Sequence, residues 1–256
     1  MAEQDLIYKV ENKIATLTIN RESKRNSISS EVTALCHQYL DEAEKDENVR
    51  VICITGSGNK AFCSGADLGG AMATDGLDSF QNYANLLKRI AGYSKPTVAR
   101  VNGYCLAGGT GFMLACDIVV ATDKAKFGTP EVNVGLFPLM IGALIFRNVL
   151  KKKAMEMCLL GEKLTAQQAL EMGLVTRVVP FEQLDEEVNG ILKTLAGKSP
   201  IGMKIGKEAF YKTADMPFEE ALDHLCGQLG AIASTADAKE GILAFLEKRE
   251  ANFTGK

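Results

Sequence analysis

The sequence predicts an α/β fold that ends in a helical C-terminal third, and three observations carry this prediction. Apolar runs with strand character alternate with amphipathic helical segments up to about residue 121. Two turns rich in small residues, at 61–68 and 101–109, each follow such a run. From residue 141 onward, helical patterns follow one another almost without interruption. Alternating strands and helices imply parallel strand pairing through helical crossovers.

The first elements follow from hydrophobic periodicity. Residues 5–20 alternate as two strands joined by a turn at 11–13, with every second residue facing one side. A helix is predicted to run to Lys45 from an N-cap at Ser29 or Ser30. Its apolar stripe is expected to consist of Val32, Leu35, Cys36, Tyr39, Leu40 and Ala43.

The remaining elements alternate between strands and helices up to about residue 121, and those from residue 141 onward are almost all helices. Residues 69–76 are mostly small and predict a mobile loop beside the first turn. Expected strands lie at 51–55, 97–101, 118–121 and 175–179. Expected helices lie at 77–91, 109–116, 141–149, 151–160, 165–172, 181–196, 200–213, 217–231 and 235–248. Amphipathic helices without a sheet of their own must pack against the first part of the chain or against another subunit.

Composition narrows the functional classes. The 256 residues carry a net charge of −3, which argues against bulk nucleic-acid binding. The seven cysteines form no C-x-x-C pair, so neither a zinc site nor a disulfide framework is expected. The acidic N-terminus lacks the basic and apolar blocks of a signal peptide, and no apolar run is long enough to span a membrane. We therefore expect a cytoplasmic protein that binds neither nucleic acid nor membranes.

The two turns are the strongest functional signal. Small residues let the backbone approach a ligand closely, and the second turn opens directly into a predicted helix. Amide groups at a helix start are unpaired and lie at the positive end of the helix dipole. Two such amide sources directed at one point would form an oxyanion hole, which stabilises an enolate. Spacing alone leaves open the alternative that both are ordinary turns.

Ten segments, taken in order and spacing, resemble one family over nearly the whole chain. They are Ile14–Arg21, Asn26–Ile28, Ala61–Leu68, Lys95–Ala99, Asn102–Gly109, Cys116–Ile118, Phe127–Val132, Gly135–Pro138, Ala169–Val175 and Phe245–Arg249. Together they resemble the crotonase (enoyl-CoA hydratase/isomerase) superfamily. The resemblance implies a crotonase-like ββα spiral core at 1–195 and a helical trimerisation region at 196–256. It also implies an acyl-CoA thioester substrate, no separate cofactor because coenzyme A is part of that substrate, no metal, and a homotrimer or homohexamer.

The resemblance also implies catalytic groups. The amides of Ala66 and Gly108 match the oxyanion-hole positions, and Glu131 matches a catalytic glutamate. Hydratases of this family carry a second glutamate three residues after the oxyanion-hole glycine, where this chain has Gly111. Hydration needs one group to take a proton from water and another to protonate the α-carbon, whereas one carboxylate can move a proton from the α-carbon to the γ-carbon. The departure at Gly111 therefore favours a 3-enoyl-CoA to 2-enoyl-CoA isomerase.

Further residues are implied for binding. The bulky run Leu139, Met140 and Ile141 together with Gly111 suggests a reshaped, apolar acyl pocket. The coenzyme A residues expected from the resemblance are Arg25, Ala61, Ser64, Ala66, Asp67, Leu68 and Lys248. Lys248 is expected to reach the nucleotide phosphates in its own or an adjacent subunit.

Two other functions stay open. A hydratase, or another lyase or hydrolase of this superfamily, could use a substitute acid such as Asp67, Asp75 or Asp78. A non-catalytic acyl-CoA binder is also compatible with the sequence, because a protein can keep the fold of an enzyme family without its catalytic activity.

Overall fold

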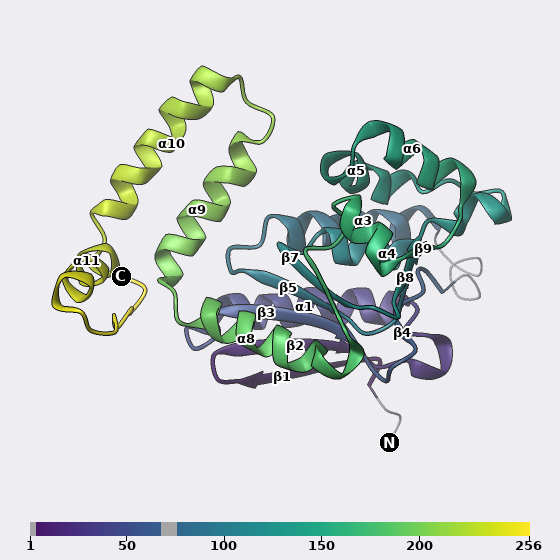
Figure 1. Cartoon of the computed structure of the whole chain (residues 1–256), viewed down its shortest axis with the longest axis horizontal. Helices are drawn as coiled ribbons and strands as arrows, with labels where there is room; N and C mark the ends of the chain where they lie inside the picture. The colour runs from purple at the N-terminus through teal and green to yellow at the C-terminus, as the bar shows by residue number, and fades with distance from the viewer. Residues whose placement is uncertain (1–3, 68–75) are drawn as a thin grey trace.

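The computed structural model describes residues 4–67 and 76–256. Its centre is a six-stranded sheet in the order β1-β2-β3-β5-β7-β10 (Figure 1). Strands β1 and β2 pair antiparallel, and the other neighbours pair parallel, as the alternation of strands and helices predicted. The strands are β1 (Leu6–Glu11), β2 (Ile14–Ile19), β3 (Val51–Gly56), β5 (Thr97–Val101), β7 (Ile118–Thr122) and β10 (Arg177–Val179).

A second sheet of four short strands lies beside the first, in the order β4-β6-β8-β9. Its strands are β4 (Ala61–Cys63), β6 (Tyr104–Leu106), β8 (Lys126–Gly128) and β9 (Leu164–Thr165). Sequence reasoning missed this sheet, because strands of two or three residues are too short to show a period of two. Strands β4 and β6 belong to the segments expected to be only turns, so the sheet holds those turns next to each other.

Helices cover both faces of the six-stranded sheet. Helices α1 (Ser30–Lys45), α3 (Gly76–Ala91) and α4 (Gly108–Leu114) share one large core with the sheet, and α8 (Leu184–Ala196) packs in a smaller core. Strand β3 contributes Ile52 and Ile54 to the first core and Val51 and Cys53 to the second, so it is buried on both faces. Ser29 caps α1 by accepting a hydrogen bond from the Val32 amide, and all six stripe residues are buried, as predicted.

The remaining helices form a layer near the second sheet and an arm. Helix α9 follows α8 after a three-residue connection, and Figure 1 shows α9 to α11 extending away from the sheets. Their bounds are α5 (Leu139–Asn148), α6 (Lys151–Leu160), α7 (Ala166–Glu171), α9 (Pro200–Thr213), α10 (Phe218–Ala233) and α11 (Ala236–Glu247). Short 3-10 turns are η1 (Glu22–Lys24), η2 (Pro130–Val134) and η3 (Phe181–Gln183). In the part of the chain that the structure describes, every helix is too short or too polar to cross a bilayer.

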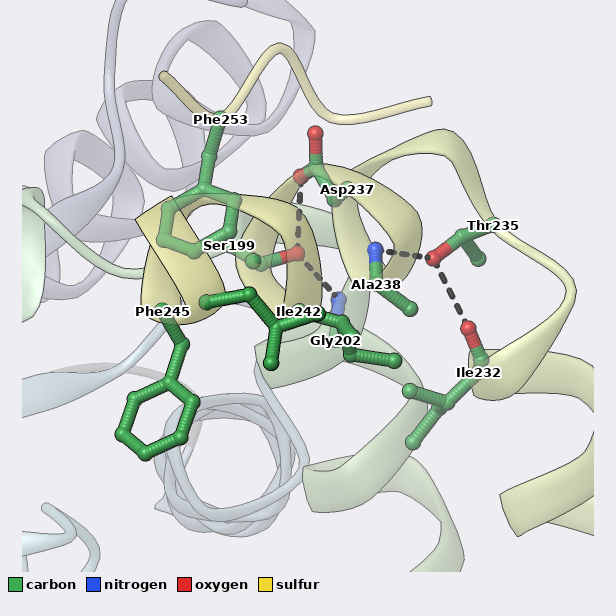
Figure 2. A pocket seen from close by; sticks show the side chains of 11 residues that line it. Ser199, Gly202, Ile232, Thr235, Asp237, Ala238, Ile242, Phe245 and Phe253 are labelled. Atoms are coloured by element: carbon green, nitrogen blue, oxygen red, sulfur yellow. Dashed lines mark hydrogen bonds between the residues drawn. The ribbon is translucent and has the colours of Figure 1, made fainter. Parts of the chain in front are cut away.

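Asp237 ties the arm together at the base of α11. Its buried carboxylate accepts hydrogen bonds from the Ser199 hydroxyl at 2.7 Å and from the backbone amides of Thr254 at 2.7 Å and Gly255 at 3.0 Å. Figure 2 shows Asp237 and Ser199 beside an apolar pocket whose lining includes Ile242 and Phe253. This pocket has a volume of about 410 Å³. The C-terminal segment is thereby fixed against α9 and α11.

Candidate active site

The two turns meet at one edge of the second sheet. Strands β4 and β6 pair parallel, so the backbone leaves both strands at the same edge. The Ala66 nitrogen lies 3.6 Å from the position that a Cβ atom would take on Gly108. Among the described residues, neither the Ala66 nor the Gly108 amide donates a backbone hydrogen bond. The first turn of α4 thus presents an unpaired amide beside a second unpaired amide, as an oxyanion hole requires.

Two glycines permit this close approach. A Cβ atom on Gly109 would lie 2.2 Å from the carbonyl oxygen of Cys63, so only glycine lets α4 start against β4. Gly65 has φ +97°, and a Cβ atom there would lie 2.7 Å from that of Ala107. The small residues that marked the turns in the sequence are therefore needed for backbone packing as well as for access.

Ala107, which precedes the Gly108 amide, adopts a strained conformation. Its φ of 50° and ψ of −128° lie in a region that glycine favours and that costs other residues about 1–3 kcal/mol. The Ala107 amide donates to Gly128 at 2.9 Å, and its carbonyl accepts from the Thr110 amide at 2.9 Å. Neighbouring strand β8 and the first turn of α4 thus hold the peptide that carries the Gly108 amide, the second candidate oxyanion donor.

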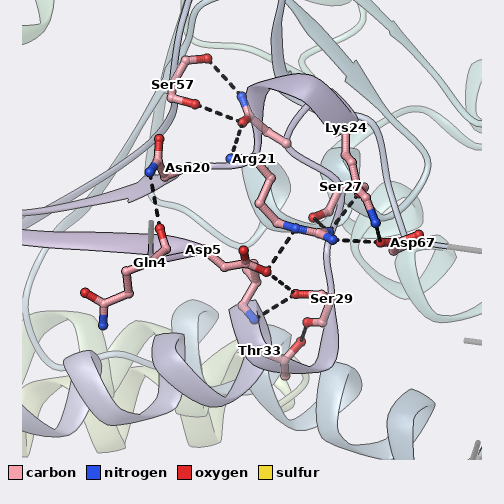
Figure 3. Close-up of polar contacts among 12 residues, drawn as sticks. Gln4, Asp5, Asn20, Arg21, Lys24, Ser27, Ser29, Thr33, Ser57 and Asp67 are labelled. Carbon is pink, nitrogen blue, oxygen red and sulfur yellow. Dashed lines mark hydrogen bonds and ion pairs between the residues drawn. The ribbon is translucent and has the colours of Figure 1, made fainter. Parts of the chain in front are cut away.

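Arg21 holds the first turn in place. Figure 3 shows its guanidinium between Asp5, Ser27 and Asp67, with nitrogen–oxygen distances of 2.9 Å to Asp5 and 2.8 Å to Asp67. The hydrogen bond from Arg21, opposed by burial and assisted by Lys24, lowers the pKa of Asp67. Asp67 is therefore an ionised partner of two cations, which argues against its use as a substitute proton donor.

Glu131 lies in η2, directly after strand β8, and is partly buried. Burial raises the pKa of its carboxyl, and a hydrogen bond from its own backbone amide opposes this effect. Its Oε2 atom is buried and has no hydrogen-bond partner among the described residues. Buried carboxylate oxygens are normally paired, so an unpaired one indicates a group kept for a ligand or a proton.

The space beside Gly111 is filled by side chains from two other helices. A Cβ atom on Gly111 would lie 2.5 Å from Cγ2 of Ile141 and 2.9 Å from the hydroxyl oxygen of Tyr83. Tyr83 is 8% exposed, packs against Phe112, and donates its hydroxyl proton to the Gly108 carbonyl. Sequence reasoning missed Tyr83, which lies 28 residues before Gly111 and is marked by no local pattern. Ile141 belongs to the bulky run 139–141, which was expected to shape an acyl pocket together with Gly111.

A basic cleft of about 560 Å³ lies beside the same sheet. It is lined by Arg25, one of the residues expected to bind coenzyme A, and by Leu106, which lies two residues before Gly108. Sequence reasoning missed the other members of this cleft. They are Asn59, Lys60, Asn102, Gly103, Tyr104, Lys124, Lys163 and Phe181. Phosphates favour such a cluster of cations, and Lys163 also lies 5.4 Å from the centre of the Tyr104 ring.

The other expected binding residues are distributed unevenly. Ala61 is buried in β4, with its carbonyl accepting from Asn26 at 2.7 Å, and the Ser64 amide donates to the Arg25 carbonyl at 3.2 Å. Leu68, Asp75 and almost all of the expected loop at 69–76 lie outside the described residues. Asp78 is exposed in the first turn of α3.

Two of the expected acyl-pocket residues are open to solvent, and one expected coenzyme A residue lies in the helical arm. Leu139 and Met140 begin α5 and are 77% and 36% exposed. Lys248 is the C-cap of α11, which Figure 1 shows on the opposite side of the molecule from β4 and β8. Within residues 4–67 and 76–256, no three His, Cys, Asp or Glu side chains are grouped so that they could hold a metal ion.

Comparison with known proteins agrees with this geometry. The sequence profile described as enoyl-CoA hydratase/isomerase matches residues 9–256. The chain is 34% identical to the 2,3-dehydroadipyl-CoA hydratase of Escherichia coli over 98% of this chain and 99% of that protein. It is 32% identical to the crotonyl-CoA hydratase of Syntrophomonas wolfei over the full length of both. A crystal structure of an enoyl-CoA hydratase from Bacillus anthracis superimposes with a TM-score of 0.95 at 29% identity, covering 99% of this chain and 100% of that one. The chain belongs to the enoyl-CoA hydratase/isomerase family and has its crotonase fold.

Proposed function

We propose that this protein moves the double bond of a 3-enoyl-CoA to the 2-position, with Glu131 as the single acid–base group. The observation that carries the proposal is that the chain has a glutamate at position 131 and a glycine, in place of a second glutamate, at position 111. In support, the Glu131 carboxylate has a buried oxygen without a hydrogen-bond partner among the described residues. The position that matches the family's second glutamate is Gly111, and Tyr83 and Ile141 fill the space beside it.

The chemistry needs only the groups already described. The Glu131 carboxylate takes a proton from the α-carbon of the 3-enoyl thioester, and the electron pair moves onto the thioester oxygen as a dienolate. The Ala66 and Gly108 amides donate hydrogen bonds to that oxygen. Protonated Glu131 then returns the proton to the γ-carbon, which leaves the double bond between the α- and β-carbons. The raised pKa of Glu131 suits it to both steps, because a group that accepts and then releases one proton should not be a weak base.

The position of the basic cleft indicates how the acyl-CoA substrate would be oriented in the site. With the acyl group beside Glu131 and the carbonyl at the two amides, the pantetheine arm would pass Leu106 and bring the nucleotide phosphates to the cations of the cleft. Lys60 directly precedes β4 in sequence, and the Arg25 carbonyl accepts a hydrogen bond from the amide of Ser64, the residue after β4. Lys248 would contribute only from an adjacent subunit.

The relatives described above are named as hydratases, so hydration is the second candidate function. One panel separates the two: 2-enoyl, 3-enoyl and cyclic acyl-CoAs, with mass spectrometry for gain of water and chromatography for a shifted double bond. We expect the wild-type chain to convert 3-enoyl-CoA, and we expect Glu131→Gln to lose about a hundredfold or more of that rate. Hydration of crotonyl-CoA at an ordinary enzyme rate, without double-bond movement, would refute the proposal. Binding of coenzyme A thioesters without turnover would indicate the non-catalytic alternative.

A further inference from the structure

Tyr83 places a polar group in the part of the site where this chain has no second carboxylate. Its ring comes from α3, packs against Phe112 with ring centres 5.8 Å apart, and is almost fully buried. Its hydroxyl donates to the Gly108 carbonyl, and so contacts the residue whose amide belongs to the oxyanion hole.

Three positions locate this hydroxyl at the reaction centre. The hydroxyl oxygen is 2.9 Å from the Cβ position of Gly111 and 3.4 Å from that of Gly108. The Ala66 amide nitrogen is 3.6 Å from the second of these points. Tyr83 therefore adjoins both the oxyanion amides and the vacant glutamate position.

The hydroxyl is a proton donor and not a base. Burial, with the nearby Cys63, Cys105 and Glu131, raises the pKa of Tyr83 well above that of an exposed tyrosine, so the phenol stays protonated over the working range of the enzyme. Because its proton is committed to the Gly108 carbonyl, Tyr83 is not suited to activating water. Its hydroxyl and the Ile141 side chain lie so close to the Cβ position of Gly111 that a side chain there would force them to move.

We propose that Tyr83 is a specificity-determining residue that keeps a reactive water away from the β-carbon and so restricts Glu131 to moving the double bond. This inference rests on the proposed isomerase function. Hydration through the same carboxylate would need a water oxygen to bond to the β-carbon while Glu131 takes the water proton. The electron pair of the double bond would move onto the thioester oxygen, and Glu131 would return the proton to the α-carbon. This addition would require Glu131 alone to make both proton transfers that two groups ordinarily divide between them. The space beside Gly111 that a water would need is also filled by Tyr83 and Ile141.

The test is the partition between the two reactions in position-83 variants. Tyr83→Ala removes the ring, Tyr83→Leu keeps part of its volume, and Tyr83→Phe removes only the hydroxyl. The matched control is Tyr93→Phe, because Tyr93 is also buried and its hydroxyl donates to a backbone carbonyl, that of Leu40, in the same core. For each variant, the rate of 2-enoyl-CoA hydration is divided by the rate of 3-enoyl-CoA isomerisation, and a thermal melt records folding.

We expect this ratio to rise about tenfold or more in Tyr83→Ala, the change that about 1.4 kcal/mol of relative barrier produces. Tyr83→Leu should show a smaller rise, and Tyr83→Phe a smaller one still, because it vacates only the space of the hydroxyl beside Gly111. Tyr93→Phe should keep the wild-type ratio. A merely structural role would lower both rates together and leave the ratio unchanged, and that result in Ala and Leu variants would overturn the inference. If Tyr83→Ala does not fold, the Leu variant decides alone. Wild-type isomerisation with an unchanged ratio in the variants refutes this inference only, whereas a wild-type protein that hydrates without isomerising refutes the proposed function as well.

Discussion

Replacing Ala107 with glycine should stabilise the protein, although alanine-to-glycine changes ordinarily destabilise. Ala107 has φ 50° and ψ −128° in the turn between β6 and α4. Glycine adopts this conformation freely, so Ala107→Gly should recover the backbone strain, about 1–3 kcal/mol. Against this, glycine raises the conformational entropy of the unfolded chain, which destabilises the folded protein by about 0.4–1 kcal/mol. The lost methyl group, which is only partly buried, costs about 0.5 kcal/mol more.

The net expectation is a gain of about 1 kcal/mol, which corresponds to a rise in Tm of about 3 °C for a chain of this size. Urea denaturation and a thermal melt of the same preparations measure it. The matched control is Ala34→Gly, an exposed alanine within α1 with ordinary helical backbone, which should lose about 1 kcal/mol. If Ala107→Gly and Ala34→Gly destabilise the protein equally, the turn is not strained and the reasoning is wrong.

Two further outcomes are expected. Because burial raises the pKa of Glu131, ionising this carboxyl opposes folding: the cost is absent below its unfolded pKa and fully present above its folded pKa. Glu131→Gln should therefore raise Tm at neutral pH and raise it less near about pH 4, so an equal shift at both values would contradict the assignment. We also propose that the helical arm assembles the chain into a trimer or hexamer, because its large apolar side chains are unusually exposed for a monomer, with Phe218 77%, Leu229 67% and Phe245 81% exposed. Sedimentation velocity should show a trimer or larger at micromolar concentration, and a stable monomer there would end this proposal.

The long elements could be predicted because their causes are local. The run 51–54 is apolar throughout, and β3 is buried on both faces of a parallel sheet. The Ser29 cap and the stripe of α1 are set by residues three or four apart, and the structure has both where the sequence predicts them. Helices α6 and α9 have the predicted bounds, 151–160 and 200–213.

In the candidate site, too, single positions could be predicted from the sequence, whereas contacts between distant residues could not. Glu131 and the missing carboxylate at Gly111 could be identified from residue order and resemblance, since each is a statement about one position in the chain. The bulky run 139–141 could also be linked with Gly111 from the sequence, although the direct contact of Ile141 with Gly111 could not. The contact of Tyr83 could not be foreseen at all, because Tyr83 reaches this space from 28 positions earlier. The Arg21–Asp67 ion pair joins residues 46 apart and was missed for the same reason.

The sequence by itself determined the alternation of strands and helices, the two turns and the single carboxylate, because periodicity, capping and small residues act over a few neighbouring positions. Only the tertiary structure decided that β4 and β6 pair in a second sheet, that this pairing brings the Ala66 and Gly108 amides to one edge, and that Ala107 is strained there. The physical reason is that strands of three residues gain their stability from partners distant in the chain, and that the space left by a missing side chain is filled by whichever packed neighbours the fold supplies.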